Sequence, residues 1–256
     1  MQYQQQNPYQ DPRQVDHALA THANAMVRSE ATAKFFSKIY ATMVTGLVVT
    51  GGVGFAVSKS SAMMEMIYSG PAYIVLTVVL IAACFGLSAL LWKLPSGVGA
   101  ILFYLFAALE GVALSAIFIV YDMSTVIAPT FLICGAMFAG LSIYGMTTKR
   151  DLGPIGTGAL MVVFGLILVS IVNAWFLKME GLSLVLSYGI VALISIVTAW
   201  DTQKLRNYIL AQDPRNTSAA QQEMNNKIII LGAFELFLDF IILFIHMLRI
   251  VAASRD

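Results

Sequence analysis

Charged residues are scarce in this chain of 256 amino acids. Asp, Glu, Lys and Arg together make up 11% of it, whereas 59% of the residues are hydrophobic and the mean hydropathy is +0.79. A soluble domain has about 25% charged residues, so this chain has too few charges to cover the surface of a water-soluble globule. The net charge of +1 also excludes a strongly basic nucleic-acid-binding protein and a highly charged disordered chain. The composition is that of an integral membrane protein.

Cysteine is scarce as well, because Cys84 and Cys134 are the only two in the sequence. Both lie in apolar runs, and neither has a partner at the spacing of a metal-binding motif. The two residues are therefore predicted to be buried free thiols, and neither a disulfide nor a metal site is expected from them.

Long uncharged runs are abundant from Ile39 onward. A bilayer core of about 30 Å requires about 20 helical residues, and runs of about this length recur. They are continuous and do not alternate as the strands of an outer-membrane barrel do. The sequence thus predicts an all-α integral membrane protein whose seven transmembrane helices form one domain over residues 35–256. The seven runs are Ile39–Val57, Ala72–Trp92, Val98–Val120, Val126–Met146, Gly156–Leu177, Leu182–Trp200 and Ile228–Val251.

Residues 1–34 differ from everything that follows. The segment begins MQYQQQNPYQDPRQ, which is rich in Gln and Pro and poor in apolar side chains. It lacks the short apolar core and the small-residue cleavage site of a signal peptide. Its composition predicts a disordered polar tail on the cytoplasmic side.

The distribution of positive charge predicts the orientation. Eleven of the 15 Lys and Arg residues lie on the side of the N-terminus, and four lie on the opposite side. The positive-inside rule then places the N-terminus in the cytoplasm and the C-terminus on the opposite side of the membrane. Trp92, Trp175 and Trp200 lie at or near the ends of runs, where an interfacial belt of aromatic residues is expected.

Four acidic residues depart from the pattern because they lie within or at the end of a predicted span: Glu110, Asp201, Glu235 and Asp239. An ionisable side chain at the centre of a span costs roughly 2.5–3.5 kcal/mol on insertion scales. Glu235 and Asp239 are four residues apart and share a helix face. Asp239 lies roughly 16 Å into the seventh run at 1.5 Å per residue, close to the bilayer midplane.

Two interpretations of these acids remain open from the residues alone. They are either hydrogen-bonded contacts between helices or parts of a functional site. For Glu110 both interpretations stand, whereas the depth of Asp239 and its acidic neighbour favour function. Asp201 is either the last residue of a span or the first of a cytoplasmic loop. His246, near the outer end of the seventh run, is expected to be a packed or interfacial histidine and not a ligand.

Several segments resemble the Bax inhibitor-1 family, also called the transmembrane Bax inhibitor motif family. AWDTQKL at the end of the sixth run and LGAFELFLDFIILFIHMLRI in the seventh resemble the corresponding family tracts. EGVALSAIFIVY and YGMTTKRDL resemble the bacterial branch, which implies a multi-pass protein of the bacterial plasma (inner) membrane, with the C-terminus outside. The resemblance extends from about residue 35 to the C-terminus, and it implies a seventh helix placed centrally between two layers of three helices.

The resemblance also implies an activity. Family members are associated with a pH-sensitive calcium leak across the membrane, whose sensor is a pair of aspartates. By motif position these fall on Asp201 and Asp239, and the basic residue that partners the first aspartate falls on Lys93. Glu235 and Glu110 are then candidates for an ion path. No tightly bound cofactor is expected, with calcium as the transported ion.

Physical chemistry supports such a sensor. Ca²⁺ prefers oxygen ligands, and carboxylates are the best ones available inside an apolar bundle, so Asp201 and Asp239 are predicted to bind calcium. Two carboxylates held close in a low dielectric cannot both ionise cheaply and share a proton instead. A shared proton would hold the two helices together. Its loss would add repulsion and create a cation site.

Three other functions are weighed against a calcium leak. A retinal protein needs a Schiff-base lysine, and Ile228–Val251 contains none. An aspartyl membrane protease would carry the segment GxGD and a serine membrane protease GxSG, and neither segment occurs; no enzyme is therefore expected. The resemblance to the bacterial branch implies one further alternative, a non-transport regulator that partners a membrane-anchored ATP-dependent protease, with the tail as its recognition element.

Overall fold

The computed structural model describes residues 12–213 and 218–255; for residues 12–24 and for Ala174, Trp175 and Glu180 it describes only the backbone. The described chain is helical, and its elements in order are α1 (Pro12–Ser58), α2 (Ser61–Tyr68), α3 (Ala72–Leu91), α4 (Ser96–Leu114), α5 (Ile117–Val120), the π-helical turn η1 (Met123–Ile127), α6 (Ala128–Thr147), α7 (Gly153–Val172), the π-helical turn η2 (Asn173–Leu177), α8 (Glu180–Ala211) and α9 (Ala219–Ala253).

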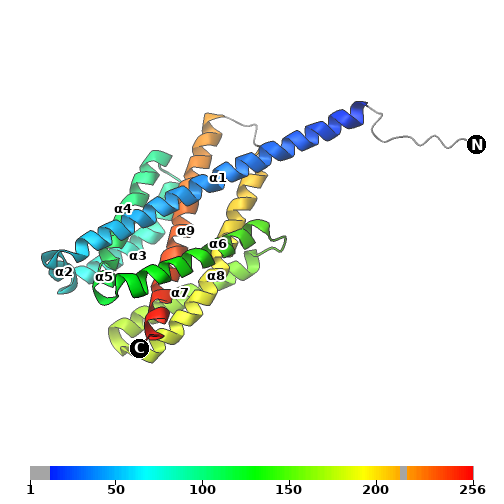
Figure 1. The fold of residues 1–256 in the computed structure, drawn as a ribbon. Helices are drawn as coiled ribbons and strands as arrows, with labels where there is room; N and C mark the ends of the chain where they lie inside the picture. The colour runs from blue at the N-terminus through cyan, green and yellow to red at the C-terminus, as the bar shows by residue number, and fades with distance from the viewer. Residues whose placement is uncertain (1–11, 214–217, 256) are drawn as a thin grey trace, which may run out of the picture.

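Seven of the helical segments are long and apolar enough to cross a membrane. They coincide with the seven predicted runs, which confirms an all-α fold with seven candidate transmembrane helices. α4 and α5 together form the third span, and η1 and α6 together form the fourth. In Figure 1 the spans form one bundle, from which the N-terminal part of α1 extends.

The predicted disordered tail is only partly compatible with this fold. α1 begins at Pro12, so the backbone of residues 12–34 is helical, whereas residues 1–11 lie outside the described residues. Proline suits the first helical position because its missing N–H would be unbonded there in any case. The segment ALATHANAMVRSEATAK that follows contains many good helix formers. The Gln- and Pro-rich composition at the beginning of the chain therefore did not predict the helix that starts at Pro12.

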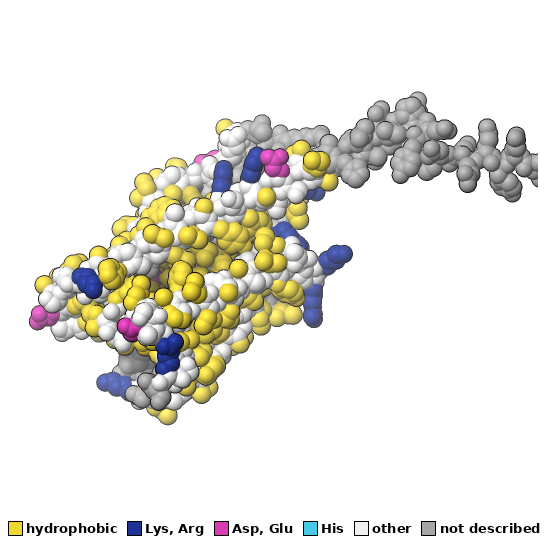
Figure 2. All heavy atoms as spheres, viewed as in Figure 1, with side chains coloured by type: hydrophobic (Ala, Val, Ile, Leu, Met, Phe, Trp, Pro, Cys, Tyr) yellow, Lys and Arg dark blue, Asp and Glu magenta, His cyan; other side chains and the backbone are white. Residues whose placement is uncertain are grey.

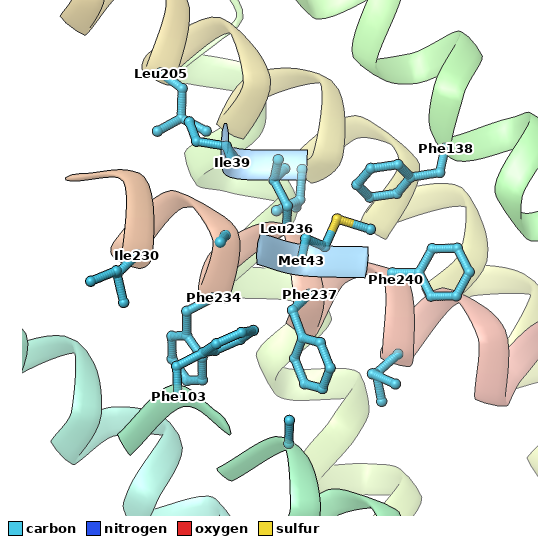
Figure 3. Close-up of a cluster of buried hydrophobic side chains, with 14 of the residues drawn as sticks. Ile39, Met43, Phe103, Phe138, Leu205, Ile230, Phe234, Leu236, Phe237 and Phe240 are labelled. Carbon is cyan, nitrogen blue, oxygen red and sulfur yellow. The ribbon is translucent and has the colours of Figure 1, made fainter. Parts of the chain in front are cut away.

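α9 is the most buried of the spans. In its most apolar stretch 67% of the residues are buried, compared with 17–39% in the other six. It packs against α1, α3, α4, α6 and α8. Figure 3 shows side chains of α9 meeting Phe103 of α4, Phe138 of α6 and Met43 of α1. The rings of Phe103 and Phe237 meet edge-on, with centroids 5.6 Å apart.

Small residues let the helices around α9 approach closely, as is common in membrane bundles. A Cβ added to Gly145 of α6 would collide with the carbonyl oxygen of Ala199 in α8. A Cβ added to Gly156 of α7 would collide with the side chain of Trp200. Both contacts fix the position of α8 just before Asp201.

The outer surface fits a lipid environment. Figure 2 shows hydrophobic side chains along the flanks of the bundle, with Lys and Arg gathered toward its ends. Trp92 at the C-terminal end of α3 is half exposed, as expected for an interfacial residue. Trp200 differs from this expectation because α8 continues to Ala211 and Trp200 packs inside the bundle; the side chain of Trp175 lies outside the described residues.

Both cysteines are free, as predicted. Cys134 is fully buried in the core, whereas Cys84 on α3 is only partly buried.

Candidate functional site

A lysine joins two carboxylates between α8 and α9. The ammonium Nζ of Lys204 lies 3.0 Å from Oδ1 of Asp201, one helical turn earlier on α8. The same Nζ lies 3.1 Å from Oε2 of Glu235 on α9. It also lies 4.7 Å from the centroid of the Trp200 ring, in a cation–π arrangement. One ammonium therefore connects the two helices that carry the predicted sensor.

Burial increases from Lys204 inward. The side chain of Lys204 is 43% exposed, that of Glu235 is 26% exposed and that of Asp201 is 8% exposed. Asp239, one turn beyond Glu235 on α9, is 5% exposed as a residue. The cluster therefore opens toward the surface at Lys204 and ends in the core at Asp239.

Asp239 is the least satisfied member of this cluster. Electrostatic interactions join it to Asp201 and Glu235, and Thr198 of α8 interacts with it as well. Its Oδ2 atom is buried and has no hydrogen-bond partner among the described residues. A buried carboxyl oxygen without a partner is costly, so Asp239 is suited to bind a proton or a cation.

The charges of the cluster do not balance. If every group were ionised, the carboxylates of Asp201, Glu235 and Asp239 would outnumber the ammonium of Lys204 by two. Excess negative charge in a low dielectric is strongly unfavourable, so the site retains protons or attracts cations. In the described part of the chain, no three His, Cys, Asp or Glu side chains lie close enough to hold a metal ion. Calcium binding by the pair Asp201 and Asp239 stays a prediction.

Hydrogen bonds hold the end of α8 on which Asp201 and Lys204 lie. Gln203 is buried, accepts a hydrogen bond from the Leu152 backbone N–H (2.9 Å) and donates one to the Arg150 carbonyl (2.7 Å). The guanidinium of Arg206 donates to the carbonyls of Met146 and Thr148 at the end of α6 (2.8 and 2.9 Å). These bonds satisfy carbonyls that a helix end leaves free and tie α8 to the connection between α6 and α7.

The start of α9 is anchored in a similar way. Glu223 accepts hydrogen bonds from the backbone N–H and the hydroxyl of Ser96, at the start of α4 (2.6 and 2.8 Å). Lys227 donates to the carbonyl of Trp92 at the end of α3 (3.2 Å). An acid at a helix N-terminus and a base at a helix C-terminus both complement the helix dipoles.

Not all predicted site residues join the cluster. Lys93 is exposed in the turn between α3 and α4, and no ion pair of the described residues involves it. In this structure the cation beside Asp201 is Lys204. Glu110 lies on α4 and interacts with Tyr73 and Cys84 of α3, separately from the carboxyl groups between α8 and α9.

His246 is a packed histidine, as predicted. It is 9% exposed, and its Nδ1 lies 3.1 Å from the hydroxyl of Ser187 on α8. This contact joins α8 and α9 near the opposite end of the bundle from Lys204.

Lys204 is the site residue that sequence reasoning missed. Its spacing of three from Asp201 would have indicated an ion pair on a continuing helix. The contact of Lys204 with Glu235 connects different helices and has no local sequence signal.

Comparisons with known proteins agree with this architecture. The family model described as "Inhibitor of apoptosis-promoting Bax1" matches residues 32–256. The inner membrane protein YbhL of Escherichia coli is 40% identical over 223 residues, which cover 86% of this chain and 92% of YbhL. An uncharacterized protein of Rickettsia prowazekii is 32% identical over 245 residues, covering 93% of this chain and 97% of that protein. An uncharacterized protein of Borreliella burgdorferi is 30% identical over 225 residues, covering 87% and 93%.

The family match covers the first span from residue 32 onward, the other six spans in full and the whole carboxyl cluster. The relatives are matched over nearly their full lengths. This chain therefore belongs to the Bax inhibitor-1 family of membrane proteins.

Proposed function

We propose that this protein is a pH-sensitive calcium leak of the bacterial inner membrane, gated by the carboxyl groups of Asp201, Glu235 and Asp239. The observation that carries the proposal is the charge imbalance of this cluster, in which one ammonium serves three buried or half-buried carboxyl groups. A cation with oxygen ligands relieves that imbalance as well as a proton does, and Ca²⁺ takes such ligands.

In the closed state, Asp201 and Asp239 share a proton and Lys204 occupies the space between Asp201 and Glu235. Loss of the shared proton adds repulsion between α8 and α9 and favours their separation. Lys204 is sufficiently exposed to swing outward while its stem stays in place. A transported calcium ion then moves past the carboxylates and transiently takes the place of the Lys204 ammonium.

The roles of the two remaining predicted residues follow from their positions. Glu235 lies between the exposed Lys204 and the buried Asp239 and serves as the entrance to the ion path. Glu110 on α4 would serve a later stretch of the path. Lys93 acts on Asp201 only if α3 moves toward α8, so its predicted role belongs to a state other than this one. With the N-terminus in the cytoplasm and the C-terminus outside, the exposed end of the cluster faces the cytoplasm.

Calcium flux tests the proposal directly. The purified protein is reconstituted in liposomes that contain a calcium-sensitive dye, and flux is followed between about pH 6 and pH 8, a range in which a coupled carboxyl pair can titrate. Flux should depend on pH, and Asp201→Asn and Asp239→Asn should each alter that dependence. Asp151→Asn is the matched control, because Asp151 is exposed in the connection between α6 and α7. Equal flux from wild-type and empty liposomes at every pH would refute the leak.

The cluster gives no reason to expect an enzyme. Paired aspartates also hydrolyse peptide bonds, but that chemistry requires a substrate backbone beside both carboxyl groups. Asp239 lies inside the continuous helix α9, and the residues before it are Leu-Phe-Leu, with no glycine to open the helix.

A second candidate function is regulation of a membrane-anchored ATP-dependent protease. The feature that favours it is the extension of α1 from the bundle in Figure 1, along which residues 25–30 are exposed. Deletion of residues 1–34 should abolish co-purification with such a protease and leave calcium flux unchanged. Unchanged co-purification would exclude the extension as the recognition element.

A further inference from the structure

An apolar groove separates α1 from α6. It has a volume of about 850 Å³ and is lined by both helices, with Phe240 of α9 at its floor. Val48 of α1 and Leu132 of α6, both about 70% exposed, lie on its rim, so the groove opens toward the side of the bundle. Its volume is within the range of about 300–1,000 Å³ that is typical of small-molecule sites. In Figure 2 the flank between these helices is lined with hydrophobic side chains.

One end of the groove is polar. Tyr40 of α1 and Ser142 of α6 both line it. Ser142 is 3% exposed, and the hydroxyls of Tyr40 and Ser142 are buried. The Tyr40 hydroxyl interacts with the hydroxyls of Ser142 and Thr202, although neither Tyr40 nor Ser142 makes a hydrogen bond of normal geometry with any described residue. Both hydroxyls therefore retain the capacity for a further hydrogen bond.

Basic side chains lie beyond this polar end. Lys149 and Arg150 are exposed and follow the end of α6. Arg206 is bound to the last carbonyls of α6. Asp151 is the acid beside them, so positive charge prevails.

We propose that this groove binds an anionic phospholipid, with one acyl chain along α6, a polar oxygen of the lipid at Tyr40 and Ser142, and the headgroup phosphate near Lys149 and Arg150. The apolar stretch from Ser142 back to Ile127 is about 22 Å long at 1.5 Å per residue. That length exceeds half of the bilayer core of about 30 Å, so the groove accommodates an acyl chain that enters from one leaflet. Charge complementarity selects an anionic headgroup.

The lipid would lie close to the carboxyl cluster. Phe240, on the floor of the groove, directly follows Asp239, and its ring contacts Phe131 and Phe138 of α6 at centroid distances of 5.3 and 5.7 Å. The Tyr40 hydroxyl also lies near Thr202, the neighbour of Asp201. An acyl chain in the groove therefore contacts α9 beside Asp239. It also fills the space that α1 and α6 leave between them and packs against both helices.

Two pairs of glycines provide a matched test. Gly51 and Gly135 line the groove, and a Cβ added to either meets no atom within 4 Å. Gly52 follows Gly51 on α1, and Gly140 lies five residues after Gly135 on α6; both are equally unobstructed and lie outside the groove. Gly51→Phe/Gly135→Phe fills the groove with two rings, whereas Gly52→Phe/Gly140→Phe adds the same rings to the outer surface.

The probe is phosphatidylglycerol with a photoreactive diazirine in its acyl chain, added to the full-length protein in phosphatidylcholine vesicles. Labelled peptides from α1 and α6 should dominate in the wild type and in Gly52→Phe/Gly140→Phe, and they should disappear in Gly51→Phe/Gly135→Phe. Ser142→Ala should weaken labelling about fivefold, the loss expected for one hydrogen bond. Unlabelled phosphatidylglycerol should compete, and added phosphatidylcholine should not.

Labelling spread evenly over all lipid-facing helices, or unaffected by the groove-filling pair, would overturn the proposal. Equal competition by both unlabelled lipids would overturn the headgroup assignment. A dimer that excludes the probe from the groove would show that a second copy of the chain occupies it and would overturn the lipid proposal. None of these readouts measures calcium flux, so a failure of the leak and a failure of the lipid site are distinguishable.

Discussion

Replacing Lys204 by Met tests the gate at the point where α8 and α9 are joined. The substitution keeps the length of the side chain and removes the ammonium, so the contacts with Asp201 (3.0 Å) and Glu235 (3.1 Å) are lost. An exposed ion pair contributes about 0.2–1 kcal/mol, whereas breaking a buried pair costs about 3–5 kcal/mol. Lys204 is 43% exposed and Asp201 is 8% exposed, so both contacts together should contribute about 1–2 kcal/mol to the closed state.

This free energy sets the size of the effect on flux. Because 1.4 kcal/mol corresponds to a tenfold change in an equilibrium constant, Lys204→Met should increase the open fraction about 5- to 30-fold while the closed state predominates. The measurement is initial calcium flux into dye-loaded liposomes at equal protein content. Lys227→Met is the control, because Lys227 contacts the Trp92 carbonyl at the end of α3 and no carboxylate of the cluster. If Lys204→Met leaves flux unchanged or lowers it, Lys204 does not hold the gate closed.

Three further predictions concern the cluster and its supports. Asp239→Asn should flatten the pH dependence of flux between about pH 6 and pH 8, because the proton shared with Asp201 is lost; a full pH response in this variant would contradict the shared proton. Gly145→Val should destabilise the protein by about 1–3 kcal/mol through overlap with the Ala199 carbonyl, measured by denaturation in mixed micelles against Gly140→Val. Gln203→Ala should lower the melting temperature and loosen the connection between α6 and α7, seen as faster hydrogen exchange at Leu152, which loses its acceptor; unchanged exchange would show that another group holds this connection.

The seven spans could be predicted from the sequence because a transmembrane helix is defined by the length of an apolar run. The end of α8 could not be predicted in the same way. The apolar run ends at Trp200, but the helix continues to Ala211 because Gln203 and Arg206 bond to the connection after α6. Those bonds depend on tertiary contacts that no local pattern encodes. As a result, Lys204 lies on a helix one turn from Asp201 and is not part of a loop.

The candidate acids were predictable for a different reason, since a carboxyl group in an apolar run is conspicuous in any sequence. Their partners were not, because partners come from other helices. Glu235 meets Lys204 of α8, whereas Glu110 faces Tyr73 and Cys84 of α3. Two glutamates in different spans thus have different surroundings. Only the packing of the helices shows which of them belongs to the cluster.

The position of the carboxyl cluster supports the proposal that changes in its charge move α9. α9 is the most buried span, and an apolar residue in place of Asp239 would pack there without the cost of a buried carboxyl oxygen that has no hydrogen-bond partner. The groove beside Phe240 weakens the same region, because α1 and α6 leave space where side chains could have packed. In the proposed gate, the unbalanced charge next to incomplete packing would lower the barrier for α9 to move against its neighbours. Protons and calcium at one face of α9, and lipid at the other, would then act on the same movable element.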